Sequence, residues 1–213
     1  MPPITLLVLA DPAEPRLKLL ARLPEETRLA VGNRAEAFRD AAPEAEAALC
    51  WFTPRALLEE VFPAAPRLRW VHSSAVGVER VLFPALVESP VVLTNSRGIF
   101  SSSLAEFALG AVMFFAKDFR RMVRTQEAGV WDCFDVEEVA GRTLGILGYG
   151  DIGRTVAERA RAFGMKVIAV RRRPELSASD PRLEAVYPVA RLDEWLARSD
   201  YVVVSAPLTP ETR

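Results

Sequence analysis

Three closely spaced glycines stand between an apolar run and a helical pattern, and this arrangement restricts the fold more than any other feature. The run TLGIL at 143–147 leads into GYGDIG, which contains Gly148, Gly150 and Gly153. Apolar positions at helical spacing follow over 151–164. Glycine permits a tight turn from a strand into a helix and close packing of the two. The pattern therefore predicts a strand, a turn and a helix, as at the start of an α/β unit.

Short apolar runs alternate with helical patterns along most of the chain. Runs without regular polar alternation are typical of parallel strands that helices cover on both faces. The predicted fold class is therefore α/β, with parallel sheets. Expected strands occupy 4–9, 28–31, 47–52, 68–74, 90–96, 143–147, 165–170 and 200–207, and expected helices occupy 14–23, 34–41, 54–62, 76–86, 151–164 and 191–199.

The pattern divides the chain into three parts, which are residues 1–98, 99–140 and 141–213. The first is expected to be one small α/β domain, and the third the beginning of a second. The middle part is expected to form a long helix over 101–126, with serines suited to capping its start, followed by an irregular arm. The apolar stretch from Leu104 to Phe115, together with the arm, predicts a subunit interface and hence a homodimer.

Charge and cysteine content exclude several classes of protein. The formal net charge is −1, so the chain as a whole is not attracted to nucleic acid or to an anionic membrane. Cys50 and Cys133 lie far apart, which argues against a disulfide framework or a zinc site. No apolar run approaches the roughly 20 residues that span a bilayer. The N-terminal segment has a short apolar run without a basic leader, which predicts a buried first strand and not a signal peptide. We expect a cytoplasmic protein without membrane or nucleic-acid partners.

The glycine pattern predicts a dinucleotide site, because it lies between a predicted strand and a predicted helix. Gly148 permits the tight turn, Gly150 lets a pyrophosphate approach the backbone, and Gly153 lets the helix pack closely on the strand. Asp151 and Ile152 open the helix, whose N-terminal amides and dipole favour phosphates. A tight turn that binds no ligand is the alternative.

Three arginines follow the strand at 165–170, where a carboxylate usually binds the adenosine ribose of NAD. Arginine instead offers paired donors to a phosphate, so we expect a preference for NADP, carried mainly by Arg171 and Arg172. Two alternatives stay open. The arginines form a solvated basic edge, or Glu175 binds the ribose and restores the use of NAD.

Four segments, in order along nearly the whole chain, resemble the D-isomer-specific 2-hydroxyacid dehydrogenases, and most closely their glyoxylate/hydroxypyruvate reductase-like members. They are LRWVHSSAVGVE, VVLTNSRGIFSSSLAEFALG, GVW with VAGRTLGILGYGDIG, and SAPLTPETR. The resemblance implies two Rossmann/flavodoxin-like domains, the second incomplete in this chain. It also implies hydride transfer between NAD(P)H and a small 2-oxo or 2-hydroxy acid.

The resemblance also implies roles for particular residues. The backbone at Ala75, Val76 and Gly77 would hold the substrate carboxylate, and a glycine-containing loop after a strand can indeed direct amides at an anion. An ordinary strand-to-helix turn is the alternative for this loop. The remaining implied contacts are Ser103 and Leu104 near the nicotinamide, Asp151 and Ile152 at the pyrophosphate, and Ala206 and Pro207 in the coenzyme cleft.

The catalytic arginine, acidic partner and histidine of that family have no counterpart in this sequence and are expected beyond Arg213. The single histidine, His72, lies inside a predicted strand and is expected to be a packed residue. Hydride transfer to a ketone leaves an alkoxide that needs a proton. We therefore expect the chain to be a fragment of a longer enzyme, inactive alone, with an open sheet edge and uncovered apolar faces.

Two other functions are compatible with the same scaffold. One is a dinucleotide-binding sensor or co-repressor-like protein without turnover. The other is a different Rossmann dehydrogenase, such as one acting on amino acids, although the Ser-Ala-Val-Gly-Val loop and the Ala-Glu pair at Ala105 and Glu106 argue against it. If the loop holding Trp51 and Phe52 faces the active site, small substrates such as glyoxylate or hydroxypyruvate are favoured.

Overall fold

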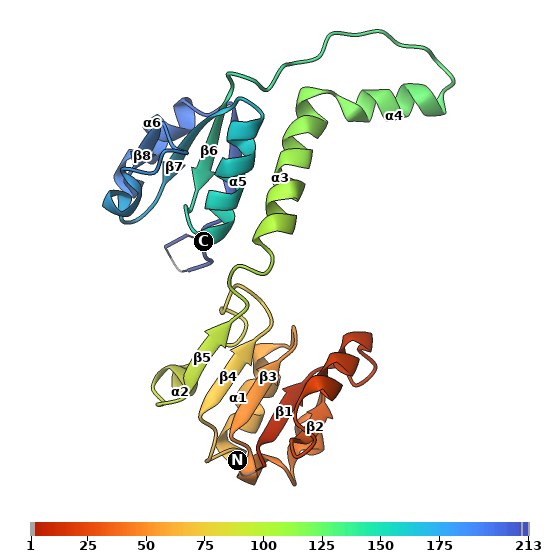
Figure 1. The fold of residues 1–213 in the computed structure, drawn as a ribbon, viewed down its shortest axis with the longest axis vertical. Helices are drawn as coiled ribbons and strands as arrows, with labels where there is room; N and C mark the ends of the chain where they lie inside the picture. The colour runs from red at the N-terminus through yellow and green to blue at the C-terminus, as the bar shows by residue number, and fades with distance from the viewer. Residues whose placement is uncertain (1–2, 210, 213) are drawn as a thin grey trace. The chain divides into compact units, whose positions relative to one another are not determined.

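The described residues, 3–209 and 211–212, form two separate parallel sheets (Figure 1). In this computed structural model the chain divides into two units, Met1–Arg97 and Gly98–Arg213. Parallel strands with helices in both units confirm the α/β fold class predicted from the sequence. Among the described residues, no helix has the length and apolar character needed to cross a membrane.

The first unit contains a five-stranded sheet in the order β2-β1-β3-β4-β5, which is the flavodoxin-like order. Its core lies on one face, where Leu7, Ala48 and Val71 occupy neighbouring positions of one row and are at most 2% exposed. The expected strands are all present. Their bounds are β1 Thr5–Leu9, β2 Arg28–Gly32, β3 Ala47–Cys50, β4 Trp70–Ser73 and β5 Val92–Asn95.

Helical structure in the first unit is shorter than expected. The segment predicted as a helix at 14–23 is a 3-10 helix that buries no side chain, so tertiary packing does not support an α-helix there. The predicted helix at 76–86 is reduced to one turn that starts at Pro84. The helices are α1 Arg55–Val61 and α2 Pro84–Val87, with 3-10 turns η1 Pro15–Arg22, η2 Ala35–Phe38, η3 Ala42–Glu44 and η4 Phe62–Ala64.

The prediction that both faces of this sheet are covered is wrong for the described residues. Leu29, Trp70 and Val92 lie on the row next to the core row and therefore point to the opposite face. They are 39%, 47% and 58% exposed. The short helices of the unit pack mainly against the core face, so the second face keeps an apolar surface.

The second unit contains a four-stranded sheet in the order β8-β7-β6-β9. In chain order this is 3-2-1-4, the arrangement of the first four strands of the Rossmann fold. The strand β8 was not predicted, because its three residues are too few to give a pattern. The bounds are β6 Thr143–Leu147, β7 Lys166–Val170, β8 Ala185–Tyr187 and β9 Tyr201–Val204.

Helices cover both faces of this second sheet. α5 (Asp151–Ala162) and α3 (Ser101–Ala116) bury Leu144 and Ile146 on one face, whereas α6 (Leu192–Ala197) buries Ile168 under Trp195 on the other. Gly164, with φ of 74°, follows the end of α5, where a left-handed glycine commonly ends a helix. Short 3-10 turns, η5 Pro174–Ser177 and η6 Val189–Arg191, complete the unit.

The long helix predicted over 101–126 is broken into α3 and α4 (Phe119–Glu127). Asp118 adopts a left-handed conformation with φ of 46°, and its side chain accepts a hydrogen bond from Arg121 N, which starts the new helix. The predicted serine cap of α3 is also wrong. The cap residue is Phe100, and Ser101 Oγ is buried without a hydrogen-bond partner among the described residues.

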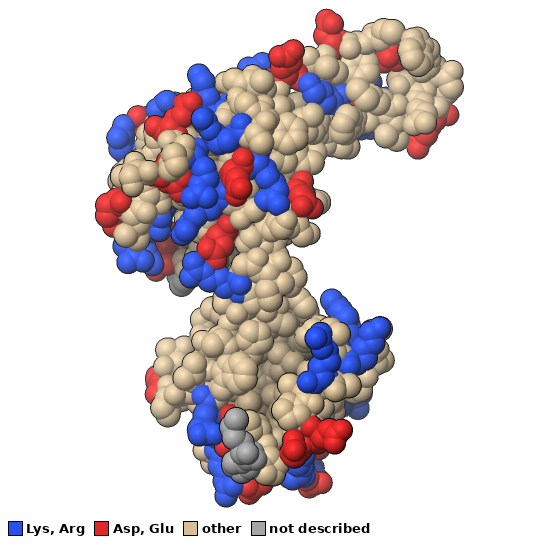
Figure 2. Space-filling view, viewed as in Figure 1, with Lys and Arg blue, Asp and Glu red and all other residues tan. Residues whose placement is uncertain are grey.

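An irregular arm follows α4 and returns to β6 (Figure 1). Arg121 pairs with Asp132 at 2.6 Å and lies over the ring of Phe134, while Trp131 is 92% exposed. Acidic and basic side chains are interspersed over the molecular face that Figure 2 shows. This distribution agrees with the formal net charge of −1.

Candidate functional site

The carboxyl ends of β6, β7 and β9 meet at one edge of the second sheet, and the glycine turn lies there. Gly148 N donates to Val170 O at 2.9 Å, and Ser205 N donates to Leu147 O at 2.8 Å. In sheets of this kind, ligands bind outside the carboxyl ends of the strands, where the strand order reverses. The turn between β6 and α5 is therefore in the position that a dinucleotide site requires.

Ser205, which follows the neighbouring strand β9, closes the turn, and no local sequence pattern predicted this contact. Its hydroxyl donates to Gly148 O at 2.6 Å. A Cβ on Gly153 would lie 2.7 Å from Gly148 O and 3.3 Å from Ser205 Oγ, so the helix start packs directly on the turn. Ala206 is half-buried against Gly148, and Pro207 beside it is exposed.

The turn leaves space where a pyrophosphate would approach. A Cβ built on Gly150 meets no atom within 4 Å. Arg154 N, which donates to Gly150 O at 2.9 Å, makes the first hydrogen bond inside α5, so the amides of Ile152 and Gly153 have no partner within the helix. Open space and unpaired helical amides fit the diphosphate of a dinucleotide.

The arginines at the end of β7 lie along the same edge. Arg171 is half-buried, its amide donates to Tyr187 O at 3.1 Å, and its guanidinium donates to Ser177 Oγ. Arg172 is exposed. The pKa of the Glu211 carboxyl is lowered, mainly by a hydrogen bond with Thr209 and in smaller part by the charge of Arg172. Within the described ranges, neither arginine forms a salt bridge with a carboxylate.

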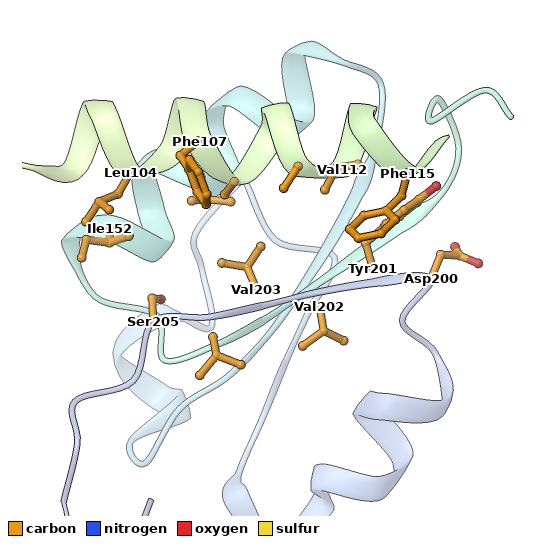
Figure 3. Close-up of a pocket in the computed structure, with 14 residues that line it drawn as sticks. Leu104, Phe107, Val112, Phe115, Ile152, Asp200, Tyr201, Val202, Val203 and Ser205 are labelled. Atoms are coloured by element: carbon orange, nitrogen blue, oxygen red, sulfur yellow. The ribbon is translucent and has the colours of Figure 1, made fainter. Parts of the chain in front are cut away.

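An apolar groove of about 530 Å³ runs along β9, on the face that carries α3 and α5 (Figure 3). Leu104, Ile152 and Ser205 lie at one end, and Tyr201 and Phe115 at the other. The outer edge of β9 pairs with no described strand, and Phe115 is 67% exposed, which agrees with the expected open edge and uncovered apolar surface. Because the groove is apolar, the glycine turn at its end suits phosphates better than the groove does.

Ser103, which the resemblance placed near the nicotinamide, is exposed in the first turn of α3.

The predicted substrate loop follows β4 in the first unit. No described residue accepts a hydrogen bond from Val76 N or Gly77 N, so both amides are available to an anion. Asn95 Nδ2 donates to Val76 O at 2.6 Å, and Ala75 N donates to Ser73 Oγ at 3.3 Å, which hold the loop. A Cβ on Gly77 would lie 2.3 Å from Glu79 Oε2, so the carboxylate of this flexible side chain lies close to the loop backbone.

Two further predictions concern the first unit. His72 is half-buried within β4, with Nδ1 2.8 Å from Thr94 Oγ1, so it is a packed strand residue as expected. Trp51 and Phe52 follow β3. Phe52 N donates a hydrogen bond to Ser74 Oγ at 3.1 Å. Ser74 immediately follows β4, so the two loops that the sequence linked to substrate are joined by a hydrogen bond.

Comparison with known proteins gives consistent results. Residues 109–213 match the family model described as D-isomer specific 2-hydroxyacid dehydrogenase, NAD binding domain. A glyoxylate reductase from Thermococcus kodakarensis is 33% identical over 165 residues, which cover 72% of this chain and 48% of the relative. A D-3-phosphoglycerate dehydrogenase from Methanocaldococcus jannaschii is 31% identical over 156 residues, covering 72% of this chain and 29% of the relative.

Among solved structures, a D-isomer specific 2-hydroxyacid dehydrogenase family protein from Aeromonas salmonicida subsp. salmonicida A449 has a TM-score of 0.82 and 29% identity. The match covers 98% of this chain and 66% of that one. The chain spans about half, or less, of the length of the two curated relatives.

Proposed function

Because this chain belongs to the D-isomer specific 2-hydroxyacid dehydrogenase family, we propose that the complete protein transfers a hydride between NAD(P)H and the C2 atom of a small 2-oxo or 2-hydroxy acid. Substrates of the glyoxylate or hydroxypyruvate kind are proposed from the sequence resemblance and from the similarity to a glyoxylate reductase. The observation that carries the proposal is the glycine turn, with open space at Gly150 and unpaired amides at the start of α5.

The residues of this chain would bind and orient the two reactants. When bound, the nicotinamide coenzyme supplies the hydride. The turn from Gly148 to Gly153 would hold its diphosphate, with Ala206 and Pro207 beside it. The free amides of Val76 and Gly77 would hold the substrate carboxylate, and orientation of the reactants lowers the barrier to transfer. No described residue of this chain is proposed to protonate the alkoxide.

The test of this activity is the loss of NADPH absorbance when the complete protein is mixed with glyoxylate or hydroxypyruvate. We expect turnover with at least one of the two acids. Coenzyme binding without turnover of either acid, or of other 2-oxo acids of similar size, would favour the sensor or co-repressor-like alternative.

We further propose that NADPH is preferred over NADH. Arg171 and Arg172 lie at the end of β7 without salt-bridge partners among the described residues, and guanidinium groups bind phosphates as paired donors. We expect Arg171→Gln and Arg172→Gln each to weaken NADPH binding by roughly 10- to 100-fold, since a hydrogen bond to a charged group contributes about 1.5–3 kcal/mol. NADH binding should change little, as measured by calorimetric titration.

The matched control is Arg173→Gln, which removes a neighbouring exposed arginine that is not assigned to the phosphate. It should leave both affinities within about twofold, because an exposed charge that makes no direct contact with the coenzyme is screened by salt. Equal loss of NADPH affinity in all three variants would mean that a general basic edge, and not a defined site, attracts the coenzyme.

A homodimer is proposed from the apolar surface of α3, α4 and the arm. Phe115, Val123 and Trp131 are 67%, 49% and 92% exposed, which is unusual for large apolar side chains on a surface without a partner. Light scattering should give twice the monomer mass, and Trp131→Ser should shift the protein toward the monomer. A monomeric wild-type protein would contradict the proposal.

We also propose that the protein is located in the cytoplasm. The free cysteines Cys50 and Cys133 agree with a reducing compartment.

A further inference from the structure

Tyr149 lies between Gly148 and Gly150 in the glycine turn. Unlike these glycines it carries a large side chain, and the residue is only 2% exposed. We propose that Tyr149 and Asp180 are positioning residues for coenzyme selectivity, because they fix the segment that carries the phosphate-binding arginine relative to the glycine turn. This inference rests on the proposed preference for NADPH and names residues that act on it without touching the coenzyme.

The first step is a hydrogen bond between segments 31 residues apart. Tyr149 Oη donates to Asp180 Oδ2 at 3.1 Å. Burial, reinforced by the charge of Asp180, raises the pKa of Tyr149 to about 12, so the phenol remains a donor at neutral pH. The bond therefore ties the glycine turn to the segment between η5 and β8.

The second step is the fixed geometry of Asp180 itself. Its Oδ1 accepts hydrogen bonds from Arg182 N at 3.0 Å and from Arg182 Nε at 2.8 Å, and its Oδ2 accepts one from Arg182 Nη2 at 3.0 Å. These bonds to Arg182 hold the pKa of the Asp180 carboxyl below its ordinary value. Paired, charge-assisted hydrogen bonds restrain orientation, so the carboxylate is a rigid acceptor for Tyr149.

The third step connects Asp180 to Arg171. Asp180 N donates to Ser177 O at 3.1 Å, and Ser177, which is 5% exposed, accepts a hydrogen bond from the Arg171 guanidinium. A continuous path therefore runs from Tyr149 through Asp180 and Ser177 to Arg171. Its two ends are the turn proposed for the diphosphate and the guanidinium proposed for the 2′-phosphate.

A dinucleotide with a 2′-phosphate has to satisfy both ends at once, whereas NADH needs only the turn. Loosening the path should therefore weaken NADPH binding and leave NADH binding nearly unchanged. A residue that merely supports the fold would weaken both coenzymes in the same proportion. The ratio of the two dissociation constants separates these cases.

The experiment compares NADPH and NADH dissociation constants for the wild-type protein, Tyr149→Phe and Tyr201→Phe by calorimetric titration. Tyr201 is a matched control, because its phenol also donates to a carboxylate, Glu137 Oε2 at 3.1 Å, but lies at the far end of β9 from the glycine turn. We expect the preference for NADPH to fall roughly fivefold in Tyr149→Phe, as for loss of one hydrogen bond, and to stay unchanged in Tyr201→Phe.

A second variant, Asp180→Asn, removes the carboxylate charge that pairs with Arg182. It should also lower the preference for NADPH over NADH. This variant keeps the inference testable if Tyr149→Phe does not fold. An unchanged ratio in the folded variants, or an equal loss for both coenzymes, would overturn this inference and leave the proposed preference intact. A wild-type protein that binds both coenzymes equally would overturn the preference and this inference together.

Discussion

Gly148→Ala is expected to destabilise the second unit by about 3 kcal/mol, which combines left-handed strain with steric overlap. Gly148 has φ of 92°, and an added Cβ would lie 2.4 Å from Ala206 N and 2.6 Å from Ala206 Cα. Backbone atoms of the loop after β9 cannot rotate aside as a flexible side chain can. Urea unfolding should show a lower midpoint, and coenzyme binding should be lost because the turn no longer closes.

Gly110→Ala is the matched control for this prediction. Gly110 is exposed within α3, and a Cβ there meets no atom within 4 Å. Alanine favours a helix over glycine by about 0.5–1 kcal/mol, so this variant should be slightly more stable than the wild-type protein. Equal unfolding midpoints for the two variants would show that the close contact between Gly148 and Ala206 does not constrain the turn.

Gly150→Ala is expected to have the opposite profile, with an intact fold and impaired coenzyme binding. Gly150 has φ of −100°, which other residues adopt, and an added Cβ would project into open space. Its methyl group would occupy space that the diphosphate needs for close approach to the backbone. We expect at least about a tenfold loss of affinity for both NADPH and NADH, equivalent to about 1.4 kcal/mol.

The unfolding free energy of Gly150→Ala should stay within about 1 kcal/mol of wild type, as expected for a glycine substitution in an allowed conformation. Unchanged coenzyme affinity in a correctly folded variant would argue that the diphosphate does not bind at this turn. Gly148→Ala and Gly150→Ala together therefore separate the structural glycine from the ligand-binding glycine.

Patterns local in sequence correctly predicted the glycine turn and every described strand except β8. The parallel strands before residue 98 and the β6–turn–α5 unit follow from apolar periodicity and from the three glycines, which act over a few residues. Helix lengths were less predictable. The break at Asp118 depends on one left-handed residue, and η1 remains a 3-10 helix because it buries no side chain.

Contacts between distant segments were not predictable from the sequence. Ser205 reaches Gly148 across 57 positions, and Tyr149 reaches Asp180 across 31. No local pattern marks either pair, because each depends on how the fold packs two segments that are distant in the sequence. The carboxylate of Glu79 beside Gly77 is a further example, since a rotatable side chain sets its place.

Calorimetric titration of the wild-type protein with NADPH and NADH, at one fixed salt concentration, is the most direct test of the dinucleotide site and its arginines. We expect both coenzymes to bind, with NADPH tighter by at least about tenfold, because a guanidinium–phosphate contact contributes more than 1.4 kcal/mol. Equal affinities would contradict the role of Arg171 and Arg172, and absence of binding by either coenzyme would contradict the assignment of the glycine turn itself.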